Sequence, residues 1–243
     1  MSAEPATLMV AASIPTALPG VEQGYRDVLD LGCGTSRALD ALALPARALR
    51  VGVDANRDAV RAAAQQRLAT RPRSGSPVHF VVADGQALPF RAESFGFVIS
   101  KAAMPYMDVP AALREVNRVL RDGGQVWMTL HPVRMAVMRI LSGLKTARIK
   151  DILYQTYAIL NGLALHYWGR QFRFPLNRRR IESVQTLTGI AKALSAAGFV
   201  NVRYQTSSRG AGYEDKDRIY GRLVAVAAWK ARAHHKEVAA TTA

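Results

Sequence analysis

The chain has 243 residues, 49% of them hydrophobic, and a formal net charge of +15 at pH 7. This length suits one large domain, or one domain with a sizeable insertion, and the apolar content is sufficient for a core. The lone cysteine, Cys33, excludes an internal disulfide and a cysteine-based metal cluster. The positive charge would suit RNA, an acidic substrate or a membrane surface. We favour an arginine-rich solvated surface instead, because no block of Lys and Arg exceeds the three residues Arg178 to Arg180.

The first residues contain a mildly apolar patch from Leu8 to Ile14, and no Lys or Arg precedes it. This pattern argues against a secretory signal and against an arginine-rich transit peptide. No apolar run approaches the roughly 20 residues that span a bilayer. We therefore expect a cytoplasmic protein without a membrane span, in which residues 1–24 form a leader or a partial lid.

Strand and helix signals alternate between residues 25 and 130. The expected strands are 27–31, 50–53, 78–82, 95–100 and 125–130. The expected helices are 36–44, 57–69 and 109–120, and we expect the flexible glycines of Asp122-Gly123-Gly124 to end the last helix. This alternation predicts an α/β fold with a parallel, doubly wound sheet and right-handed crossovers.

The alternation breaks between residues 132 and 182. Apolar residues recur there at helical spacing, and the segment holds ten Lys or Arg against two acids. We expect an inserted helical cap at 132–182 between the two parts, 25–131 and 183–232, of a single domain. A helix over 185–197, strands over 200–205 and 222–229, and a flexible tail over 233–243 complete the predicted chain.

A glycine turn follows the first strand, in the order Asp30-Leu31-Gly32-Cys33-Gly34. Glycines allow a backbone to approach a ligand closely and to adopt angles that other residues avoid. A dinucleotide fingerprint needs a third glycine, where this chain has Arg37, to bring a helix N-terminus to the pyrophosphate. The carboxylate of Asp30 disfavours phosphate and attracts the ammonium and sulfonium groups of S-adenosylmethionine. The turn therefore favours this cofactor over NAD.

Two further carboxylates follow the next two strands. Asp54 lies 20 residues after Gly34, where a carboxylate can accept both ribose hydroxyls, although it can also cap the following helix. Asp84 can accept the exocyclic amine of adenine, although it can also be a turn residue before Gly85. Because the carboxyl ends of parallel strands meet at one crevice, the combination favours a binding role for both.

Several segments resemble class I S-adenosylmethionine-dependent methyltransferases. Residues 28–35 resemble motif I, residues 52–54 the next motif, and residues 83–90 the adenine segment. Residues 94–130 are similar to the ubiquinone-biosynthesis-like, or type 11, subgroup, and the resemblance resumes at 187–202. It implies a Rossmann-like, mostly parallel seven-stranded sheet with the last strand antiparallel, and S-adenosylmethionine as methyl donor without a metal. The implied cofactor-binding residues are Asp30, Gly32, Cys33, Gly34, Asp54, Ala55, Asp84, Gly85, Gln86, Ser100 and Lys101.

The chain departs from the family pattern on the acceptor side. Ser36 replaces the usual third glycine, Gly96 replaces an aspartate, and Pro105-Tyr106 replaces paired histidines. No Asn/Asp-Pro-Pro-Tyr element follows the fourth strand, which disfavours methylation of an exocyclic base amine. A nucleophilic role for Cys33 is rejected, because a turn cysteine without a nearby histidine is usually a small packing residue.

Methyl transfer needs alignment above all, and a base only when the acceptor must lose a proton. Candidate catalytic residues are Tyr106, His131 and His166, although His131 can simply end a strand and His166 can be a helix-surface residue. Candidate acceptor-binding residues in the cap are Tyr167, Trp168, Arg170 and Phe172, which suit a planar ring with a carboxylate or carbonyl. The predicted acceptor is therefore an O, N or C atom of a small aromatic or heterocyclic metabolite.

Two alternatives stay open. Aromatic residues interleaved with arginines in the cap would also suit RNA, with bases stacked and phosphates paired. The aromatic residues are Trp168, Phe172 and Phe174, and the arginines are Arg170, Arg173, Arg178, Arg179 and Arg180. We favour the small molecule because no recognisable RNA-binding module is present. A protein that binds S-adenosylmethionine without turnover is the second alternative, and the intact Asp30, Asp54 and Asp84 argue against it. A monomer and a homodimer both remain compatible with the sequence.

Overall fold

The computed structural model describes residues 25–35, 38–42, 44–70, 77–131, 133–178, 180–206 and 224–232. The expectations for the leader at 1–24, for Ser36 and Arg37, and for the tail at 233–243 lie outside these residues.

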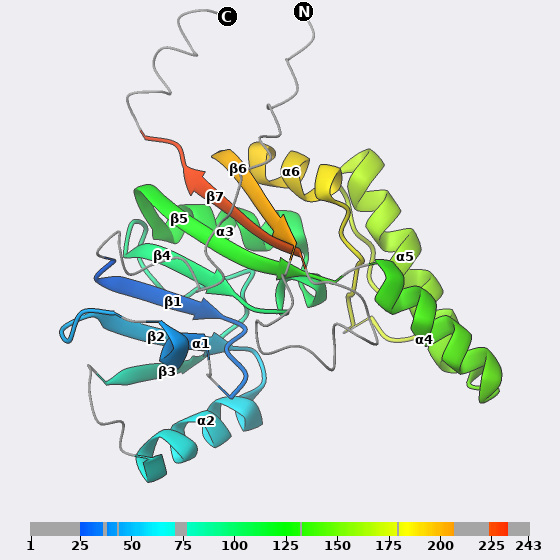
Figure 1. The fold of residues 1–243 in the computed structure, drawn as a ribbon, viewed down its shortest axis with the longest axis horizontal. Coiled ribbons are helices and arrows are strands. Elements are labelled where there is room, and N and C mark those ends of the chain that lie inside the picture. The colour runs from blue at the N-terminus through cyan, green and yellow to red at the C-terminus, as the bar shows by residue number, and fades with distance from the viewer. Residues whose placement is uncertain are drawn as a thin grey trace, which may run out of the picture.

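In the described part of the chain, seven strands form one sheet in the order β3-β2-β1-β4-β5-β7-β6 (Figure 1). The first five strands pair in parallel, whereas β7 runs antiparallel to both β5 and β6. This arrangement confirms the predicted Rossmann-like α/β sheet. The strand bounds are β1 Asp27–Leu31, β2 Leu49–Asp54, β3 Val78–Val82, β4 Phe95–Ser100, β5 Leu120–Leu130, β6 Phe199–Thr206 and β7 Val224–Lys230.

The helices connect and cover these strands. Their bounds are α1 Ala38–Ala41, α2 Arg57–Thr70, the 3-10 helix η1 Met104–Tyr106, α3 Val109–Val119, α4 Val133–Lys145, α5 Ile149–Trp168 and α6 Leu187–Ala196. The N-cap of α3 is Asp108, whose side chain accepts a hydrogen bond from Ala111 N at 3.0 Å, and Pro110 lies in the first turn. α4 and α5 stand between β5 and α6 in the chain and project beyond the end of the sheet toward which β1 and β5 point (Figure 1).

One predicted helix end is wrong. Asp122-Gly123-Gly124 does not cap α3, because Leu120 is already the C-cap, with extended backbone and an N–H that donates to Val116 O. The Leu120 side chain is fully buried, and Leu120 pairs with Phe95 at the start of β5. Because this leucine is buried in the sheet, β5 begins at Leu120, before the two glycines. Gly123, with φ of 72°, therefore lies within β5.

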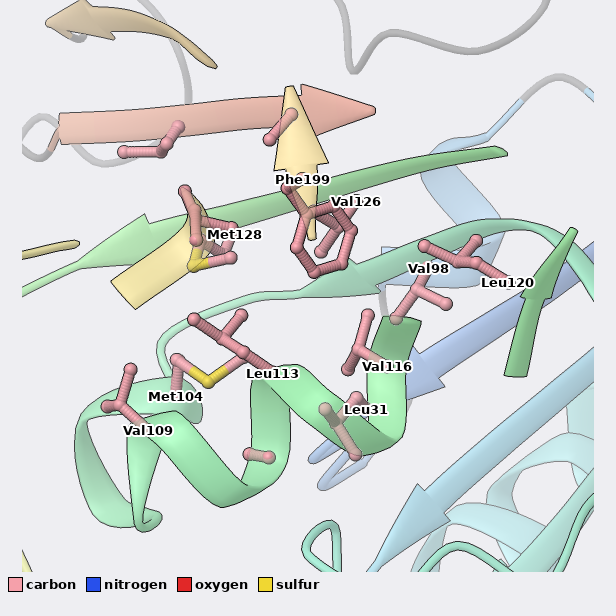
Figure 2. Close-up of a cluster of buried hydrophobic side chains, with 14 of the residues drawn as sticks. Leu31, Val98, Met104, Val109, Leu113, Val116, Leu120, Val126, Met128 and Phe199 are labelled. Atoms are coloured by element: carbon pink, nitrogen blue, oxygen red, sulfur yellow. The ribbon is translucent and has the colours of Figure 1, made fainter. Parts of the chain in front are cut away.

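The core beside α3 holds the sheet against this helix. Leu113 and Val116 of α3 lie against Val98 of β4, Val126 of β5 and Phe199 of β6, all at most 2% exposed (Figure 2). Burial of each such side chain contributes roughly 1.5–3 kcal/mol. The packing holds β4 in place, and the loop that follows β4 leads into the site.

β1 is buried on both faces. Val28, Leu29 and Leu31 are fully buried, and Asp30 between them is only 1% exposed. A central parallel strand covered on both sides is expected to be apolar throughout. Among the four buried residues of this strand, 28–31, Asp30 alone is charged, and a carboxyl group is rarely buried so completely.

Candidate cofactor and acceptor site

The glycine turn after β1 is tied to the end of β2. Gly32 N and Cys33 N both donate to Val53 O, at 2.7 and 2.9 Å. Gly32 and Gly34 have φ of 73° and 50°, in the left-handed region that glycine adopts readily. The two hydrogen bonds hold the turn open at the carboxyl edge of the sheet.

The two glycines serve different purposes. A Cβ at Gly32 would lie 2.1 Å from Ala103 Cβ, whereas no described atom comes within 4 Å of a Cβ at Gly34. Ala103 reaches Gly32 because the chain reverses at Ala102, where φ is 60° and N–H donates to Thr129 Oγ1 at 2.7 Å. Gly32 is therefore required by the loop after β4, while the space beside Gly34 is open.

Asp54 joins the turn to the end of β2. Its Oδ2 accepts from Gly34 N at 2.9 Å, and its Oδ1 accepts from Asn56 N at 2.8 Å. Asn56 Oδ1 in turn accepts from Asp58 N and Ala59 N at 3.0 and 3.3 Å. Asn56 therefore caps α2, so the carboxylate of Asp54 is not required as the helix cap.

Asp84 and the residues after it form the next part of the edge. Asp84 Oδ1 accepts from both the backbone N and the side-chain Nε2 of Gln86, at 2.9 Å each. A Cβ at Gly85 would lie 2.9 Å from Leu31 Cδ1 and from Met107 Sδ. The glycine thus lets this segment pass close to β1 and to the loop after β4.

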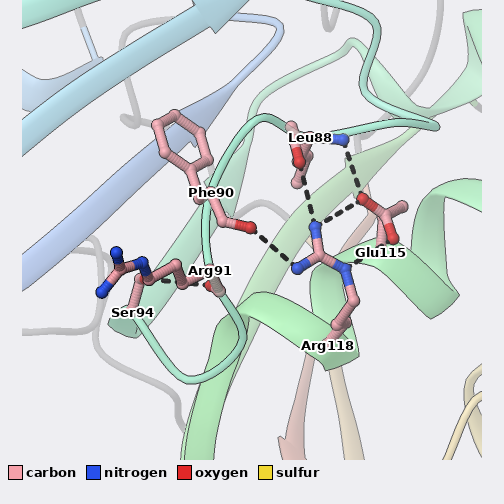
Figure 3. Close-up of polar contacts among 6 residues, drawn as sticks. All are labelled: Leu88, Phe90, Arg91, Ser94, Glu115 and Arg118. Atoms are coloured by element: carbon pink, nitrogen blue, oxygen red, sulfur yellow. Dashed lines mark hydrogen bonds and ion pairs between the residues drawn. The ribbon is translucent and has the colours of Figure 1, made fainter.

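A clamp from α3 holds the segment that follows Gln86 (Figure 3). Arg118 donates from Nη1 to Phe90 O at 2.8 Å and from Nη2 to Leu88 O at 2.9 Å. Glu115 Oε2 accepts from Leu88 N at 2.8 Å, and its Oε1 pairs with Arg118 Nε at 2.8 Å. This clamp fixes residues 88–90 by their backbone, independently of the side chains there.

The carboxyl group of Asp30 lies just behind this edge. Burial raises its pKa to about 7, with Asp54 adding to the rise and Lys101 opposing it. Asp30 Oδ2 and Ser100 Oγ are buried without a hydrogen-bond partner in the described part of the structure. A buried, unpartnered carboxylate oxygen is suited to a cationic ligand group.

The thiol of Cys33 is not activated as a nucleophile. Burial raises the pKa of its thiol to about 12, and the carboxylates of Asp30 and Asp54 add to the rise. The thiol is therefore protonated at neutral pH, and a thiolate nucleophile is absent. Its Sγ would lie 3.0 Å from a Cβ at Gly52, which makes Cys33 a packing residue between β1 and β2.

A cavity of about 340 Å³ opens along this edge. Among the described residues, its wall includes six of the expected cofactor-binding residues: Gly32, Asp54, Ala55, Asp84, Gly85 and Gln86. The other five, Asp30, Cys33, Gly34, Ser100 and Lys101, are not among the described lining residues. The strand ends that topology predicts to meet therefore do line one cavity, with Asp30 in the layer behind.

Residues 29–128, which contain this edge, match the family described as a methyltransferase domain. A demethylmenaquinone methyltransferase of Staphylococcus aureus is 26% identical over 218 residues, which are 83% of this chain and 81% of that protein. Residues 29–128 therefore form a class I S-adenosylmethionine-dependent methyltransferase domain.

Other similarities of the chain are partial. The uncharacterised protein MJ1252 of Methanocaldococcus jannaschii is 34% identical over 120 residues, 48% of this chain and 42% of that one. The chain thus spans less than half the length of the first curated relatives it matches. A methyltransferase described as putative, solved with the Trm112 activator of Haloferax volcanii, shares the fold with a TM-score of 0.58 and 19% identity, covering 86% of this chain and 84% of that one.

The opposite wall of the cavity comes from two other segments. Ala103, Tyr106 and Met107 follow β4, whereas Arg173 and Ile181 return from the segment after α5. The sequence predicts Tyr106 as a catalytic candidate and indicates Arg173 only as an RNA contact. Ile181 carried no sequence signal, because an isolated isoleucine in a loop has no distinguishing pattern.

Tyr106 lies over buried polar residues. Its ring contacts that of His131 edge to face, with centroids 5.2 Å apart. Burial raises the pKa of Tyr106, Glu182 adds to the rise, and Arg139 opposes it. The phenol is therefore neutral at physiological pH, so it acts through hydrogen bonding rather than as an anionic base.

His131 is placed behind Tyr106. It is 7% exposed, and its Nδ1 lies 3.9 Å from Glu182 Oε1. Burial lowers the pKa of His131 to about 4, and Arg139 adds to this effect. Burial also raises the pKa of Glu182, against a hydrogen bond from Tyr154 and the charges of Arg139 and Arg180. The imidazole is neutral and contacts Tyr106 rather than the cavity.

The remaining candidates lie elsewhere. His166 Nδ1 is 2.6 Å from the Oγ1 of Thr186, the N-cap of α6, so this histidine contributes to the α5–α6 contact. Four exposed residues, Tyr167, Trp168, Arg170 and Phe172, are likewise not among the described residues that line the cavity. The described chain also brings together no group of three or more His, Cys, Asp or Glu that suits a metal ion.

Proposed function

We propose that the protein transfers the methyl group of S-adenosylmethionine to an O, N or C atom of a small, planar aromatic or heterocyclic metabolite. We call the carboxyl ends of β1, β2 and β3, with the residues that follow them, the cofactor edge. The observation that carries this proposal is the cavity of about 340 Å³, which joins the cofactor edge to Tyr106, Arg173 and Ile181. In size it falls within the range of small-molecule sites.

The residues of the cofactor edge fit S-adenosylmethionine. Asp54 offers carboxylate oxygens to ribose hydroxyls, Asp84 and Gln86 offer polar groups to the adenine, and the unpartnered Asp30 carboxylate supplies charge to the ammonium. When bound, the cofactor supplies an activated methyl carbon. The chain's own task is to hold the acceptor in line with that carbon and to exclude water.

The acceptor is held by the other wall. We propose that residues 132–182 act as its cap, with Tyr106 and Ile181 offering apolar surface to a flat ring. Arg173, whose Nη1 donates to Arg178 O at 3.1 Å, suits a carboxylate or carbonyl group on the acceptor. The neutral Tyr106 hydroxyl orients a polar group of the acceptor, and His131 with Arg139 holds Tyr106 in place.

RNA is the less supported acceptor. Phe174 and Arg180, two of the aromatic and basic residues considered for RNA, already contact another residue of the cap. Phe174 contacts Tyr154 edge to face, with centroids 5.1 Å apart, and the Arg180 guanidinium lies 5.1 Å from the centroid of the same ring. Engaged side chains of this kind are not free to stack on bases.

Titration calorimetry with S-adenosylhomocysteine tests the cofactor half of the proposal. We expect binding by the unmutated protein and at least a tenfold loss in Asp84→Ala, with Asp151→Ala on the exposed surface of α5 as the matched control. Absence of binding by the unmutated protein would refute the proposal.

Methyl transfer to a panel of planar aromatic acids and their neutral analogues tests the acceptor half. Arg173→Ala should raise KM for the acids at least tenfold and spare the neutral analogues, whereas Arg170→Ala, outside the cavity, should leave both unchanged. Equal losses for acids and neutral analogues would contradict the role of Arg173.

A further inference from the structure

The outer face of α5 is an unpaired apolar row. Five of its residues recur at intervals of three, four or seven positions and are 41–68% exposed: Ile149, Leu153, Leu160, Leu163 and Tyr167. The opposite face of the same helix is buried, through Gln155, Ala158, Gly162 and Leu165. α5 is therefore apolar on both sides, and only one side is covered within the described chain.

No charged residue interrupts this row from Leu153 to Tyr167. The stretch from Ile152 to Gly169 contains no Asp, Glu, Lys or Arg. A solvated helix face normally carries charges, so an uncharged, exposed face of this length indicates an interaction surface. α4 adds a second exposed apolar row through Val137, Leu141 and Leu144. The hairpin of the two helices extends away from the sheet (Figure 1).

Positive charge frames the row at both ends. Arg148 and Lys150 stand at the beginning of α5, Lys145 ends α4, and Arg170 follows α5. The whole segment 132–182 carries ten basic and two acidic residues. At the C-terminal end of the row, Trp168 is 71% exposed. Apolar residues flanked by cations and a terminal aromatic belong to helices that lie in the headgroup region of anionic bilayers.

We propose that the α4–α5 hairpin docks on an anionic lipid surface through the outer row of α5. The helix lies flat, with Arg148, Lys150 and Arg170 at the phosphate level. No helix in the described ranges is long and apolar enough to cross a bilayer, which agrees with this orientation. A second copy fits less well, because pairing two hairpins would bring like charges together. RNA would use the arginines but leave the apolar row exposed.

Co-sedimentation of the full chain with vesicles tests this proposal. We expect at least tenfold stronger binding to vesicles of phosphatidylglycerol mixed with phosphatidylcholine than to phosphatidylcholine alone. The pair Leu153→Glu and Leu160→Glu should weaken binding at least tenfold. Leu68→Glu on α2, where the leucine is 78% exposed, is the matched control and should leave binding unchanged.

A second pair of variants tests the charges without touching the apolar row. Arg148→Glu with Lys150→Glu should lower binding to the anionic vesicles at least tenfold, whereas Arg57→Glu with Arg61→Glu on exposed α2 should have a smaller effect. Circular dichroism verifies that each variant keeps its helices.

Three outcomes would overturn the proposal. One is absence of vesicle binding together with a dimer, by light scattering, that Leu160→Glu dissociates, which would assign the row to a second copy. Another is absence of vesicle binding together with polyuridine binding that persists in Leu153→Glu and Leu160→Glu. The third is vesicle binding that neither pair of variants changes. These readouts do not depend on the methyl acceptor, so they test the docking proposal independently of the proposed reaction.

Discussion

Asp54 Oδ2 accepts a hydrogen bond from Gly34 N at 2.9 Å, so a single carboxylate connects the turn after β1 to the end of β2. The same side chain lines the cavity. Asp54 thus orders the glycine turn, and each of its oxygens keeps a second lone pair for the ribose hydroxyls that we propose it binds.

Asp54→Asn should therefore affect binding more than folding. An asparagine keeps one acceptor oxygen and loses the charge, so we expect at least a tenfold loss of S-adenosylhomocysteine affinity with about 1 kcal/mol lower free energy of unfolding. Calorimetry and urea denaturation measure the two effects. Asp58→Asn in the first turn of α2 serves as the control. Unchanged affinity in Asp54→Asn would remove this carboxylate from the site.

The two glycines of the turn should tolerate alanine very differently. Gly32→Ala places a methyl group 2.1 Å from Ala103 Cβ, and we expect a loss of about 3 kcal/mol in the free energy of unfolding. Gly34→Ala meets no described atom within 4 Å, so only the positive φ opposes it, at a cost of about 1 kcal/mol. Urea denaturation compares them. Equal losses would contradict the close approach of Ala103.

Loss of the clamp from α3 should lower both stability and ligand affinity, although the clamp lies away from the ligand. Arg118→Met removes the donors to Leu88 O and Phe90 O and should lower the free energy of unfolding by about 2 kcal/mol. Because the clamp fixes the backbone after Gln86, affinity for S-adenosylhomocysteine should also fall several-fold. Arg114→Met, exposed on the same helix, should change neither quantity. A stable variant with normal affinity would show that residues 88–90 are held by other contacts.

Sequence reasoning predicted the cofactor edge because that edge follows from topology. The strands at 27–31, 78–82 and 95–100 have the predicted bounds, since each is a short apolar run between turn signals. Parallel pairing then brings their carboxyl ends together, and Asp54 and Asp84 line the cavity as expected. Local pattern and sheet topology suffice for this half of the site.

The acceptor wall could not be predicted in the same way. Ala103 and Met107 reach the cavity because of the positive φ at Ala102, a conformation selected by the contact with Thr129 rather than by local sequence. Arg173 and Ile181 return to the cavity through long-range contacts of the cap, including the bond from Val109 N to Gln171 Oε1 at 2.6 Å. Loop geometry of this kind depends on tertiary packing.

Cofactor affinity should depend on pH through Asp30. Its pKa is about 7 in the folded protein, so its carboxyl group is mostly protonated at pH 6 and mostly ionised at pH 8. Since the ionised form attracts the ligand ammonium, affinity for S-adenosylhomocysteine should rise about tenfold between these values. Asp30→Asn should remove this part of the rise. The ligand's own titration is common to both proteins, so identical profiles in calorimetry would refute the role of Asp30.

Stability without ligand should show two opposing effects of buried groups. The pKa of Asp30 is raised on folding, so its contribution to stability is full below about pH 4 and is lost as the pH rises through about 7. The pKa of His131 is lowered on folding to about 4, so between pH 6.5 and 4 the unfolded chain binds a proton that the folded chain does not. Acid therefore stabilises the fold through Asp30 and destabilises it through His131.

His131→Phe separates these effects. The phenylalanine ring keeps the contact with Tyr106 but cannot bind a proton, so acidification from pH 7 to 4.5 should destabilise the variant less than the unmutated protein. The difference should approach about 3 kcal/mol, the free energy of a shift of this size in one buried group. Urea denaturation across this range measures it, with His79→Phe on β3 as the control histidine. Parallel stability profiles for His131→Phe and the unmutated protein would show that His131 is protonated in the folded state.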